Sequence, residues 1–239
     1  MNPSASQGDR PASNPGVSLG ALRAGSQAIW TRSRHYAEIY FDAKHSMRPV
    51  SGKFALIGSG AAGKSMIGRQ LGLLMPISVL DVDELFVARF GSIKSFAATH
   101  GWKRFFETQG ELARSLLLDP TPASASALVI MPASALCHER FVDASAHTLA
   151  VAQATTSIVC VLASANPLYG AWLSVTRQLR RGYLFSPIRK AQQYCYQSTF
   201  YSHIADYVVV NDTNVIDAAE KIRGFIGRSS SGPNPALGE

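Results

Sequence analysis

The sequence predicts an α/β domain built on a parallel sheet, and three features carry this prediction. Short apolar runs alternate with segments of helical spacing from Phe54 onward. Two of the runs, Leu128–Met131 and Ile158–Leu162, are uninterrupted, which is typical of strands covered by helices on both faces. A glycine-rich octapeptide, Gly58–Ser65, joins the first apolar run to the first helical segment. Together these features indicate a repeated βα unit.

Each apolar run is expected to form one strand of the sheet. Strands are expected near residues 54–57, 77–81, 127–131, 156–162 and 207–210. Helices are expected near residues 64–75, 83–90, 103–118, 138–153, 166–179, 187–204 and 214–226. Because helical segments separate successive strands, the five strands should lie parallel in a three-layer domain.

At 239 residues the chain has room for a single α/β domain with extensions. We expect a partly disordered N-terminal extension over residues 1–50, the domain over residues 51–228 and a flexible tail over residues 229–239. Residues 21–45 combine a loosely helical apolar pattern with several arginines. This pattern fits either a segment that docks on the domain or an organelle-targeting segment.

The composition indicates an ordinary globular protein, with 46% apolar and 16% charged residues. No stretch approaches the roughly 18 uncharged apolar residues of a membrane span, so we expect no membrane association. The three cysteines, Cys137, Cys160 and Cys195, lack metal-binding spacing. They are typical of the reduced cysteines of a cytoplasmic protein.

The net charge of +7 comes in part from one concentrated group of basic residues. Its members are Arg177, Arg180, Arg181, Arg189 and Lys190. Such a local group suits the phosphates of a small ligand better than a nucleic-acid duplex, and no nucleic-acid-binding motif is visible. We therefore expect a small-molecule substrate and no nucleic-acid partner, while the sequence leaves the oligomeric state undefined.

The octapeptide has the spacing of a phosphate-binding P-loop, G-x-x-x-x-G-K-[ST]. It reads Gly58, Ser59, Gly60, Ala61, Ala62, Gly63, Lys64 and Ser65. Glycines allow such a loop to turn its N–H groups toward phosphates, the lysine reaches the β- and γ-phosphate oxygens, and the serine hydroxyl holds Mg²⁺. A strand before the loop and a helix after it complete the expected context. The octapeptide therefore predicts a nucleoside triphosphate site.

Further motifs follow the loop in a recognisable order. They are Met66-Ile67-Gly68-Arg69-Gln70-Leu71, Asp81-Val82-Asp83, and Gly91-Ser92-Ile93 with Phe96, Gly101 and Phe105. This succession resembles the shikimate kinase family over about residues 54–226, most strongly between Phe54 and Phe105. The resemblance implies a P-loop kinase-type domain with a five-stranded parallel sheet and a lid segment. It also implies transfer of the γ-phosphoryl of ATP, with Mg²⁺, to a hydroxyl of shikimate or a related compound.

Asp81 and Asp83 lie at the carboxyl end of the second expected strand, where parallel sheets bind ligands. Asp81 is suited to hold Mg²⁺ through water, as Ser65 is to bind it directly. By resemblance, Asp83 would grip a substrate hydroxyl and orient or deprotonate it. The alternative is that these residues cap a helix, because an aspartate followed by Glu84 at a helix start is also good capping chemistry.

The basic segment Arg177–Pro187 occupies the place of the family's lid. Arg177 resembles the arginine that packs on adenine, and Arg180 or Arg181 the one that reaches the phosphates. The sequence does not decide between Arg180 and Arg181, because the Arg-Pro pair of the family is absent. The alternative is a solvated basic helix end, since cations favour helix C-termini.

The substrate half departs from the family pattern. Phe106 stands where the family has a carboxylate-binding arginine, and Gln109 where that arginine has its glutamate partner. Pro132–Ser134 replaces a triple-glycine loop, and Gln197 replaces a second arginine. Exchanging a charged bidentate fork for an amide forfeits most of the recognition of a planar carboxylate. The expected carboxylate clamp is therefore missing.

Lys103 or Arg104 would replace the missing arginine only if the helix shifted by two residues. Such a shift rotates a side chain by about 200° around the helix axis. Three hypotheses remain: an ATP-dependent kinase of a small metabolite, a catalytically degenerate domain that binds nucleotide or metabolite in a regulatory role, and an interaction module. The kinase hypothesis assigns catalysis to Lys64, Asp83 and a lid arginine.

Overall fold

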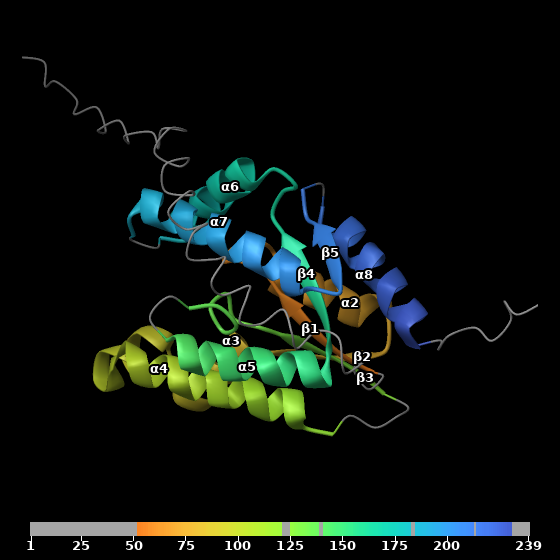
Figure 1. Ribbon diagram of the computed structural model, residues 1–239, viewed down its shortest axis with the longest axis horizontal. Helices are drawn as coiled ribbons and strands as arrows, with labels where there is room; N and C mark the ends of the chain where they lie inside the picture. Colours follow the sequence, from red (N-terminus) through yellow and green to blue (C-terminus); the bar gives the residue numbers. More distant parts are fainter. Residues whose placement is uncertain (1–51, 121–124, 139–140, 183–184, 213, 231–239) are drawn as a thin grey trace, which may run out of the picture.

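The computed structural model describes residues 52–120, 125–138, 141–182, 185–212 and 214–230. Its centre is a single sheet with the strand order β2-β3-β1-β4-β5, in which every neighbouring pair is parallel (Figure 1). The strands are β1 (Lys53–Ile57), β2 (Ile77–Asp81), β3 (Ser126–Ile130), β4 (Ser157–Leu162) and β5 (Tyr207–Val210). The predicted α/β class with a five-stranded parallel sheet is confirmed.

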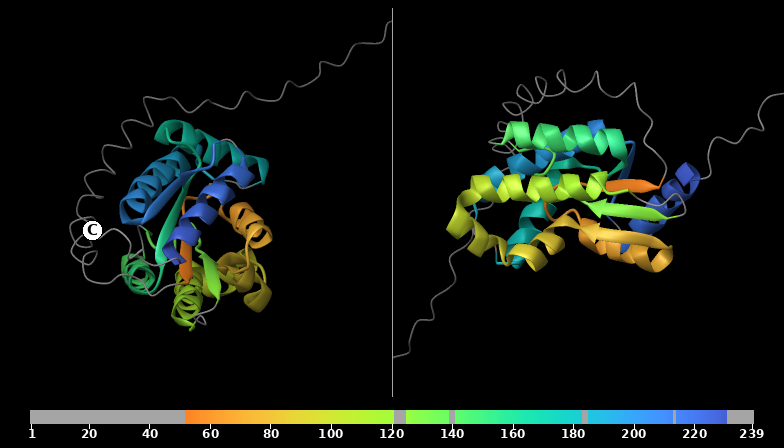
Figure 2. Two further views of the ribbon diagram at one scale, coloured as in Figure 1. Left: turned by 90° about the vertical axis from the view of Figure 1, so that its right-hand side faces the viewer. Right: turned by 90° about the horizontal axis from the view of Figure 1, so that it is seen from below.

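Helices cover both faces of this sheet (Figure 2). They are α2 (Lys64–Leu74), α3 (Val82–Phe90), α4 (Ile93–Leu118), α5 (Val142–Thr155), α6 (Pro167–Arg180), α7 (Pro187–Ile204) and α8 (Val215–Ser230). Helices α2 and α8 pack on one face, and α4, α5 and α7 pack on the other. The result is the three-layer arrangement that the sequence predicts.

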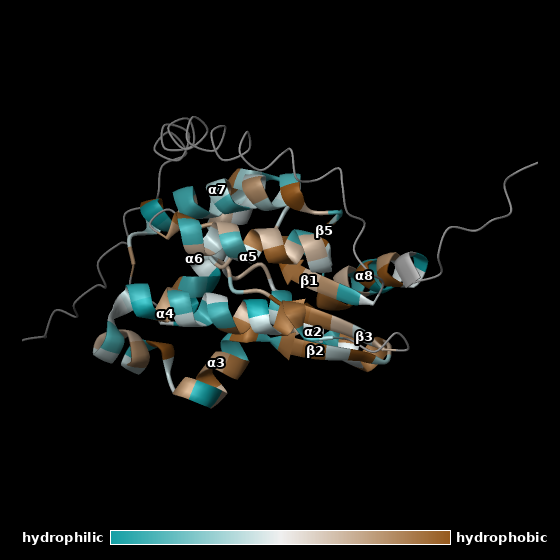
Figure 3. Cartoon of the chain, turned by 60° about the horizontal axis from the view of Figure 1, so that its bottom comes forward, coloured by the Kyte–Doolittle hydropathy of each residue, from teal (hydrophilic) through white to brown (hydrophobic). Residues whose placement is uncertain are grey.

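The alternation of side chains along the strands explains how two cores form from one sheet. In β1, Phe54 and Leu56 pack with α2 and α8, whereas Ala55 and Ile57 pack with α4, α5 and α7. Successive strand residues point to opposite faces, so a strand buried on both sides must be apolar throughout. The strands β1, β2 and β3 accordingly appear mostly brown in the hydropathy colouring of Figure 3.

The helix expected over residues 103–118 is only the second part of α4. Helix α4 begins at Ile93, capped by Ser92, whose side chain accepts a hydrogen bond from the backbone N–H of Ser95. The helix is interrupted at Gly101, which has φ 80° and ψ 158°. Glycine adopts a positive φ without the steric cost that a Cβ brings. The break lets two helical pieces of different direction follow each other, which a periodicity argument does not resolve.

Two other helix boundaries also differ from expectation. Helix α5 begins at Val142 rather than near residue 138, and α8 continues to Ser230. The expected N-terminal extension lies outside the described residues, as do residues 231–239 of the expected tail. Among the helices of the described ranges, none combines the length and the apolar character needed to cross a membrane. The cytoplasmic location stays a prediction.

Candidate active site

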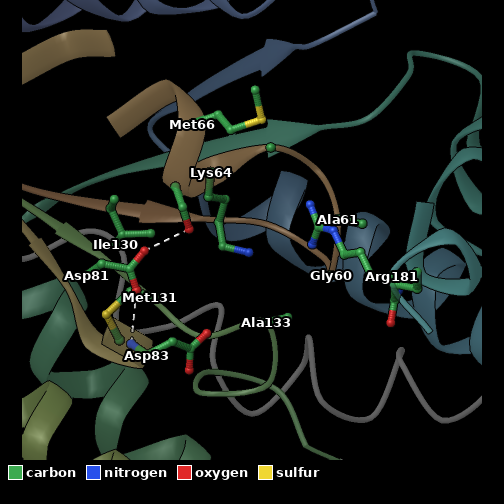
Figure 4. A pocket seen from close by; sticks show the side chains of 13 residues that line it. Gly60, Ala61, Lys64, Met66, Asp81, Asp83, Ile130, Met131, Ala133 and Arg181 are labelled. Atoms are coloured by element: carbon green, nitrogen blue, oxygen red, sulfur yellow. Dashed lines mark hydrogen bonds between the residues drawn. The ribbon is translucent and has the colours of Figure 1, made fainter. Parts of the chain in front are cut away.

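A cavity of about 220 Å³ opens at the carboxyl ends of β2 and β3, beside the loop between β1 and α2 (Figure 4). This position is where open parallel sheets bind ligands. Residues from the P-loop, from the end of β2, from the end of β3 and from α6 contribute to its wall. They are Gly60, Ala61, Gly63, Lys64, Ser65, Met66, Asp81, Asp83, Ile130, Met131, Ala133, Gln178 and Arg181.

Two glycines of the P-loop are required by its backbone path. Gly58 has φ 149° and Gly63 has φ 102°. A Cβ on Gly58 would lie 2.4 Å from the carbonyl oxygen of Val161, and one on Gly63 would lie 2.3 Å from Nδ2 of Asn211. Real Cβ atoms do not approach other atoms this closely, so these two positions exclude any side chain.

The carbonyl groups of the P-loop are held by side chains. Lys64 Nζ donates to the carbonyls of Gly58 at 2.7 Å and Ser59 at 3.3 Å. The three following carbonyls accept from side chains elsewhere in the fold: Ser174 Oγ to Gly60 at 2.7 Å, Arg177 Nη1 to Ala61 at 3.0 Å, and Asn211 Nδ2 to Ala62 at 2.9 Å. With these carbonyls engaged, the loop is braced for an anion at the N-terminus of α2.

Lys64 lies on the cavity wall near two carboxylates. Burial lowers the pKa of its ammonium group, while Asp83 and Asp81 act in the opposite direction and favour the charged form. Its predicted contact with the β- and γ-phosphates stays a prediction. The lysine nevertheless lies with the loop backbone on the same cavity, as that role requires.

Ser65 and Asp81 form the pair that the sequence predicts as metal ligands. Ser65 Oγ donates to Oδ2 of Asp81 at 2.7 Å (Figure 4). The other oxygen of Asp81 accepts from the backbone N–H groups of Asp83 at 3.0 Å and Glu84 at 3.4 Å, and so caps α3. Both interpretations of Asp81 are thus compatible, because one oxygen caps the helix and the other faces the serine hydroxyl.

These two side chains fit Mg²⁺. The ion takes oxygen ligands, keeps several waters and is bound mainly by one or two protein oxygens plus phosphates. Within the described residues there is no cluster of three or more His, Cys, Asp or Glu that could form a metal cage, and a P-loop site does not need one.

Asp83 faces the cavity and has a partner that the sequence did not reveal. Gln109 Nε2 on α4 donates to Asp83 Oδ1 at 2.7 Å. Gln109 is only 3% exposed, whereas Asp83 keeps contact with the cavity. Desolvation raises the pKa of the Asp83 carboxyl, and the positive charge of Lys64 opposes this shift.

The end of α6 separates the two arginines that the sequence could not distinguish. Both arginines are exposed, but Arg181 lines the cavity beside Gly60 and Ala61 (Figure 4). Arg180 is absent from the cavity wall among the described residues. Arg177 contacts the P-loop through the carbonyl of Ala61. Its predicted contact with adenine stays a prediction.

The substrate half is closed by aromatic side chains. Phe106 lies 4.2 Å from His138 and 4.9 Å from Phe141, measured between ring centroids. These residues and Gln109 line a second cavity of only about 10 Å³, which has room for roughly one water molecule. Tyr201 Oη donates to the carbonyl of Ala133 at 2.7 Å and so anchors the segment that replaces the triple glycine.

The remaining candidates for a carboxylate clamp lie elsewhere. Gln197 is 3% exposed within α7, and among the described wall residues it belongs to neither cavity. Lys103 and Arg104 point to solvent, with nitrogens 3.9 Å and 3.8 Å from the carboxylate of Glu107. The two-residue helix shift that would bring them to the site is therefore absent from this part of the structure.

Sequence reasoning missed Ser174 and Asn211, and it named Gln109 only as the replacement of a glutamate, not as a partner of Asp83. Asn211 directly follows β5, so the rule that identified Asp81 at the end of a strand would also have found it. Ser174 lies three residues before Arg177 on α6 and therefore shares its face. No local pattern indicated the contact of Gln109 with Asp83, because the two residues are 26 positions apart in the sequence and lie on different helices.

Comparisons with known proteins agree with this geometry. A family model described as shikimate kinase matches residues 60–123. The Pentafunctional AROM polypeptides of Zygosaccharomyces rouxii and Candida glabrata are 37% and 32% identical over 75 residues, which are 30% of this chain. The matches span only 4% and 5% of the length of these two polypeptides.

Solved structures show the same fold. A shikimate kinase from Acinetobacter baumannii in complex with shikimate has a TM-score of 0.59 and 19% identity, covering 75% of this chain and 94% of that one. Shikimate kinase from Aquifex aeolicus has a TM-score of 0.53 and 16% identity, covering 76% and 99%. The chain is therefore similar to the shikimate kinase family in sequence over residues 60–123, and it has the fold of the shikimate kinases.

Proposed function

We propose that the chain is an ATP- and Mg²⁺-dependent phosphotransferase that acts on the hydroxyl of a small metabolite, shikimate or a related compound. One observation carries the proposal: a braced P-loop, the Ser65–Asp81 pair and Asp83 share one cavity wall. Phosphoryl transfer needs charge stabilisation and an aligned nucleophile rather than covalent chemistry from the protein. The cavity supplies groups for both requirements.

In the proposed reaction, the acceptor oxygen forms a bond to the γ-phosphorus while the bond from that phosphorus to the β–γ bridging oxygen breaks. ADP leaves with the electron pair, and Asp83 takes the proton of the acceptor hydroxyl. Lys64, the loop N–H groups and Arg181 would stabilise the negative charge on the transferring group. Ser65 and Asp81 would hold Mg²⁺, which neutralises phosphate charge when bound.

A second candidate is a degenerate domain that binds nucleotide or metabolite without transfer and acts as a regulator. The observation that favours it is the aromatic packing of Phe106, His138 and Phe141 in the substrate half. This packing leaves little space between α4 and α5. The two candidates agree on nucleotide binding and differ on turnover.

The first test is nucleotide binding, measured as a thermal shift with a non-hydrolysable ATP analogue and Mg²⁺. A ligand at 100 times its Kd stabilises the folded state by about 2.7 kcal/mol, so the wild type should show a clear rise. Lys64→Ala should reduce the rise. A wild type whose midpoint does not change would rule out the phosphotransferase and every form of the second candidate that binds nucleotide.

The second test is ADP release with shikimate and related polyols. The proposed enzyme should turn over at least one acceptor, and Asp83→Asn should lower that rate by about 10²–10⁴-fold, the usual contribution of general base catalysis. The regulatory domain would be favoured if the wild type binds nucleotide but releases no more ADP in the presence of an acceptor than Asp83→Asn does.

A further inference from the structure

Ala61 adopts a backbone conformation that a residue with a side chain rarely takes. Its φ is 63°, and among the non-glycine residues that the structure describes it alone has a positive φ. In this left-handed region a Cβ crowds the following carbonyl oxygen, so alanine pays an energetic penalty that glycine avoids. Such a residue persists only where the surrounding structure holds it. Contacts of the loop must therefore offset the penalty at Ala61.

The conformation of Ala61 shapes the part of the P-loop that faces the cavity. Ala61 and Gly63 both line this cavity (Figure 4). The carbonyls of Gly60 and Ala62 accept hydrogen bonds from side chains elsewhere in the fold. In a trans peptide group the N–H points away from the carbonyl, so the N–H groups of Ala61 and Gly63 point away from those side chains. A left-handed residue in such a turn gathers successive N–H groups into an anion-binding concavity.

Arg177 holds the peptide group that follows Ala61. Its Nη1 donates to the carbonyl oxygen of Ala61 at 3.0 Å. The N–H of the same peptide group, which belongs to Ala62, donates to the carbonyl of Ser59 at 3.3 Å. A change of Ala61 to a negative φ would reorient this peptide group and break both hydrogen bonds. The bond from the guanidinium is the stronger of the two, because its donor is charged.

Helix α6 places Arg177 beside other side chains that support the loop. Ser174 is three residues before Arg177 and therefore lies on the same side of the helix. Ser174 is only 1% exposed, donates to the carbonyl of Gly60 at 2.7 Å and accepts from Gln178 Nε2 at 3.0 Å. Arg177 itself is half-buried. One face of α6 thus holds two successive carbonyls of the P-loop.

We propose that Arg177 is a positioning residue whose guanidinium keeps Ala61 in the left-handed conformation and thereby keeps the N–H groups of the P-loop directed at phosphates. The proposal rests on the nucleotide binding proposed above and names a residue on which the shape of the phosphate site depends. Resemblance to the shikimate kinases implies a contact of Arg177 with adenine, which would act only on ligands that carry a base. Support of the loop acts on any polyphosphate.

The first measurement compares a non-hydrolysable ATP analogue with tripolyphosphate, which has three phosphates and no base. Both are titrated calorimetrically, with Mg²⁺, into wild type and Arg177→Ala. We expect the Kd of both ligands to rise by the same factor, roughly tenfold or more, because a charged hydrogen bond is lost. A loss confined to the ATP analogue would assign Arg177 to the base and overturn the proposal. Arg228→Ala removes the same charge from an exposed position of α8 and should leave both Kd values unchanged.

Ala61→Gly separates support of the loop from a direct attraction between Arg177 and the phosphates. Glycine adopts the left-handed conformation without the penalty, so the loop should depend less on the arginine. In the Ala61→Gly background, the factor by which Arg177→Ala weakens tripolyphosphate binding should be roughly threefold smaller or less. Equal factors in both backgrounds would indicate direct attraction and overturn the proposal. Ala205→Gly is the control, because Ala205 has φ −79°, and it should leave the factor unchanged.

The same pair of substitutions tests the free protein without any ligand. Arg177→Ala should lower the midpoint of urea unfolding, and the decrease should be smaller in the Ala61→Gly background, since residues in contact give non-additive effects. Additive effects would contradict the proposed hold on Ala61. A wild type that binds neither ligand would reject nucleotide binding, and with it the effect on phosphates. The unfolding measurements would then still decide whether Arg177 holds the loop.

Discussion

Gln109 donates a 2.7 Å hydrogen bond from its amide nitrogen to Oδ1 of Asp83, and this bond ties α4 to the start of α3. A donor to the ionised carboxylate favours the charged form, whereas burial favours the neutral one. Gln109 therefore counteracts the desolvation that raises the pKa of Asp83. It also holds one carboxylate oxygen in place, which leaves the other oxygen available to a substrate hydroxyl.

We predict that Gln109→Leu lowers kcat by roughly 10–100-fold, the equivalent of one charged hydrogen bond of about 1.5–3 kcal/mol. The acid limb of kcat/KM should also move to higher pH, because loss of the donor raises the pKa of Asp83 further and the base must be ionised to act. A pH–rate profile of wild type and variant checks this. A lower rate with an unmoved acid limb would mean that Gln109 only supports packing.

The raised pKa of Asp83 also predicts a stability effect. A carboxyl whose pKa is higher in the folded state destabilises that state at pH values above this pKa, and the penalty disappears as pH falls below the unfolded value. Asp83→Asn should therefore raise the thermal midpoint at pH 8, and the gain should shrink toward pH 4. The gain should be modest, because Asp83 keeps solvent contact through the cavity.

The matched control for this series is Glu111→Gln, which removes an exposed carboxylate from α4. It should not reproduce the pH-dependent gain. Thermal midpoints of both variants across pH 4–8 are the measurement, and a loss of stability in Asp83→Asn at pH 8 would reverse the expected sign.

The two oxygens of Asp81 have separable roles that substitution can test. Asparagine is as good a helix cap as aspartate, whereas alanine loses the cap at a cost of about 1 kcal/mol. Asp81→Asn should keep the stability of the free protein, and Asp81→Ala should lower it. Both should lose the Mg²⁺-dependent part of the thermal shift with nucleotide, as should Ser65→Ala. Full Mg²⁺ dependence in Asp81→Asn would exclude Asp81 from the metal site.

The side chains that brace the P-loop should matter for nucleotide binding. Asn211→Leu removes the donor to the carbonyl of Ala62, and a buried polar group left unsatisfied costs about 1–3 kcal/mol. We expect a lower thermal midpoint and weaker nucleotide binding, measured by calorimetric titration. Ser174→Ala should act in the same direction through the carbonyl of Gly60.

Asn214→Ala is the control for this set. Asn214 Oδ1 accepts from the backbone N–H of Asp217 at the start of α8, so its loss should lower stability through a lost cap. Because Asn214 is exposed and is absent from the described cavity wall, nucleotide affinity should stay the same. Equal losses of affinity in Asn211→Leu and Asn214→Ala would show a general effect of stability.

The parts of this site that the sequence predicted are those whose roles depend on residues nearby in the chain. Gly58–Ser65 and Asp81 were identified because their roles depend on neighbours in the chain, namely a strand before them and a helix after. The strands were identified because burial on both faces requires uninterrupted apolar runs. Functional residues whose roles depend on a single turn or strand can therefore be predicted from one sequence.

The contacts that escaped prediction depend on packing between distant segments. Asn211 reaches Ala62 across 149 residues and Gln109 reaches Asp83 across 26, and no periodicity encodes such pairs. The break at Gly101 was missed for a related reason, since glycine permits a positive φ without requiring it. Tertiary packing decides such positions, and it is available only from the fold.

The distinction between Arg180 and Arg181 also depends on the tertiary fold, because the two residues are adjacent in the sequence. Successive residues of a helix point in directions about 100° apart, so Arg180 and Arg181 start from different directions at the end of α6. Both side chains are exposed, and of the two only Arg181 belongs to the described cavity wall. We predict that Arg181→Ala lowers kcat far more than Arg180→Ala, by roughly 10²-fold or more, because a preorganised cation near the transferring phosphoryl stabilises developing charge. The ratio of the two effects in ADP release is the measurement, and Arg181→Lys should recover only part of the loss because its ammonium lacks the planar fork.

A larger loss in Arg180→Ala would mean that the end of α6 turns when the nucleotide binds, and that Arg180 is the residue that reaches the phosphates.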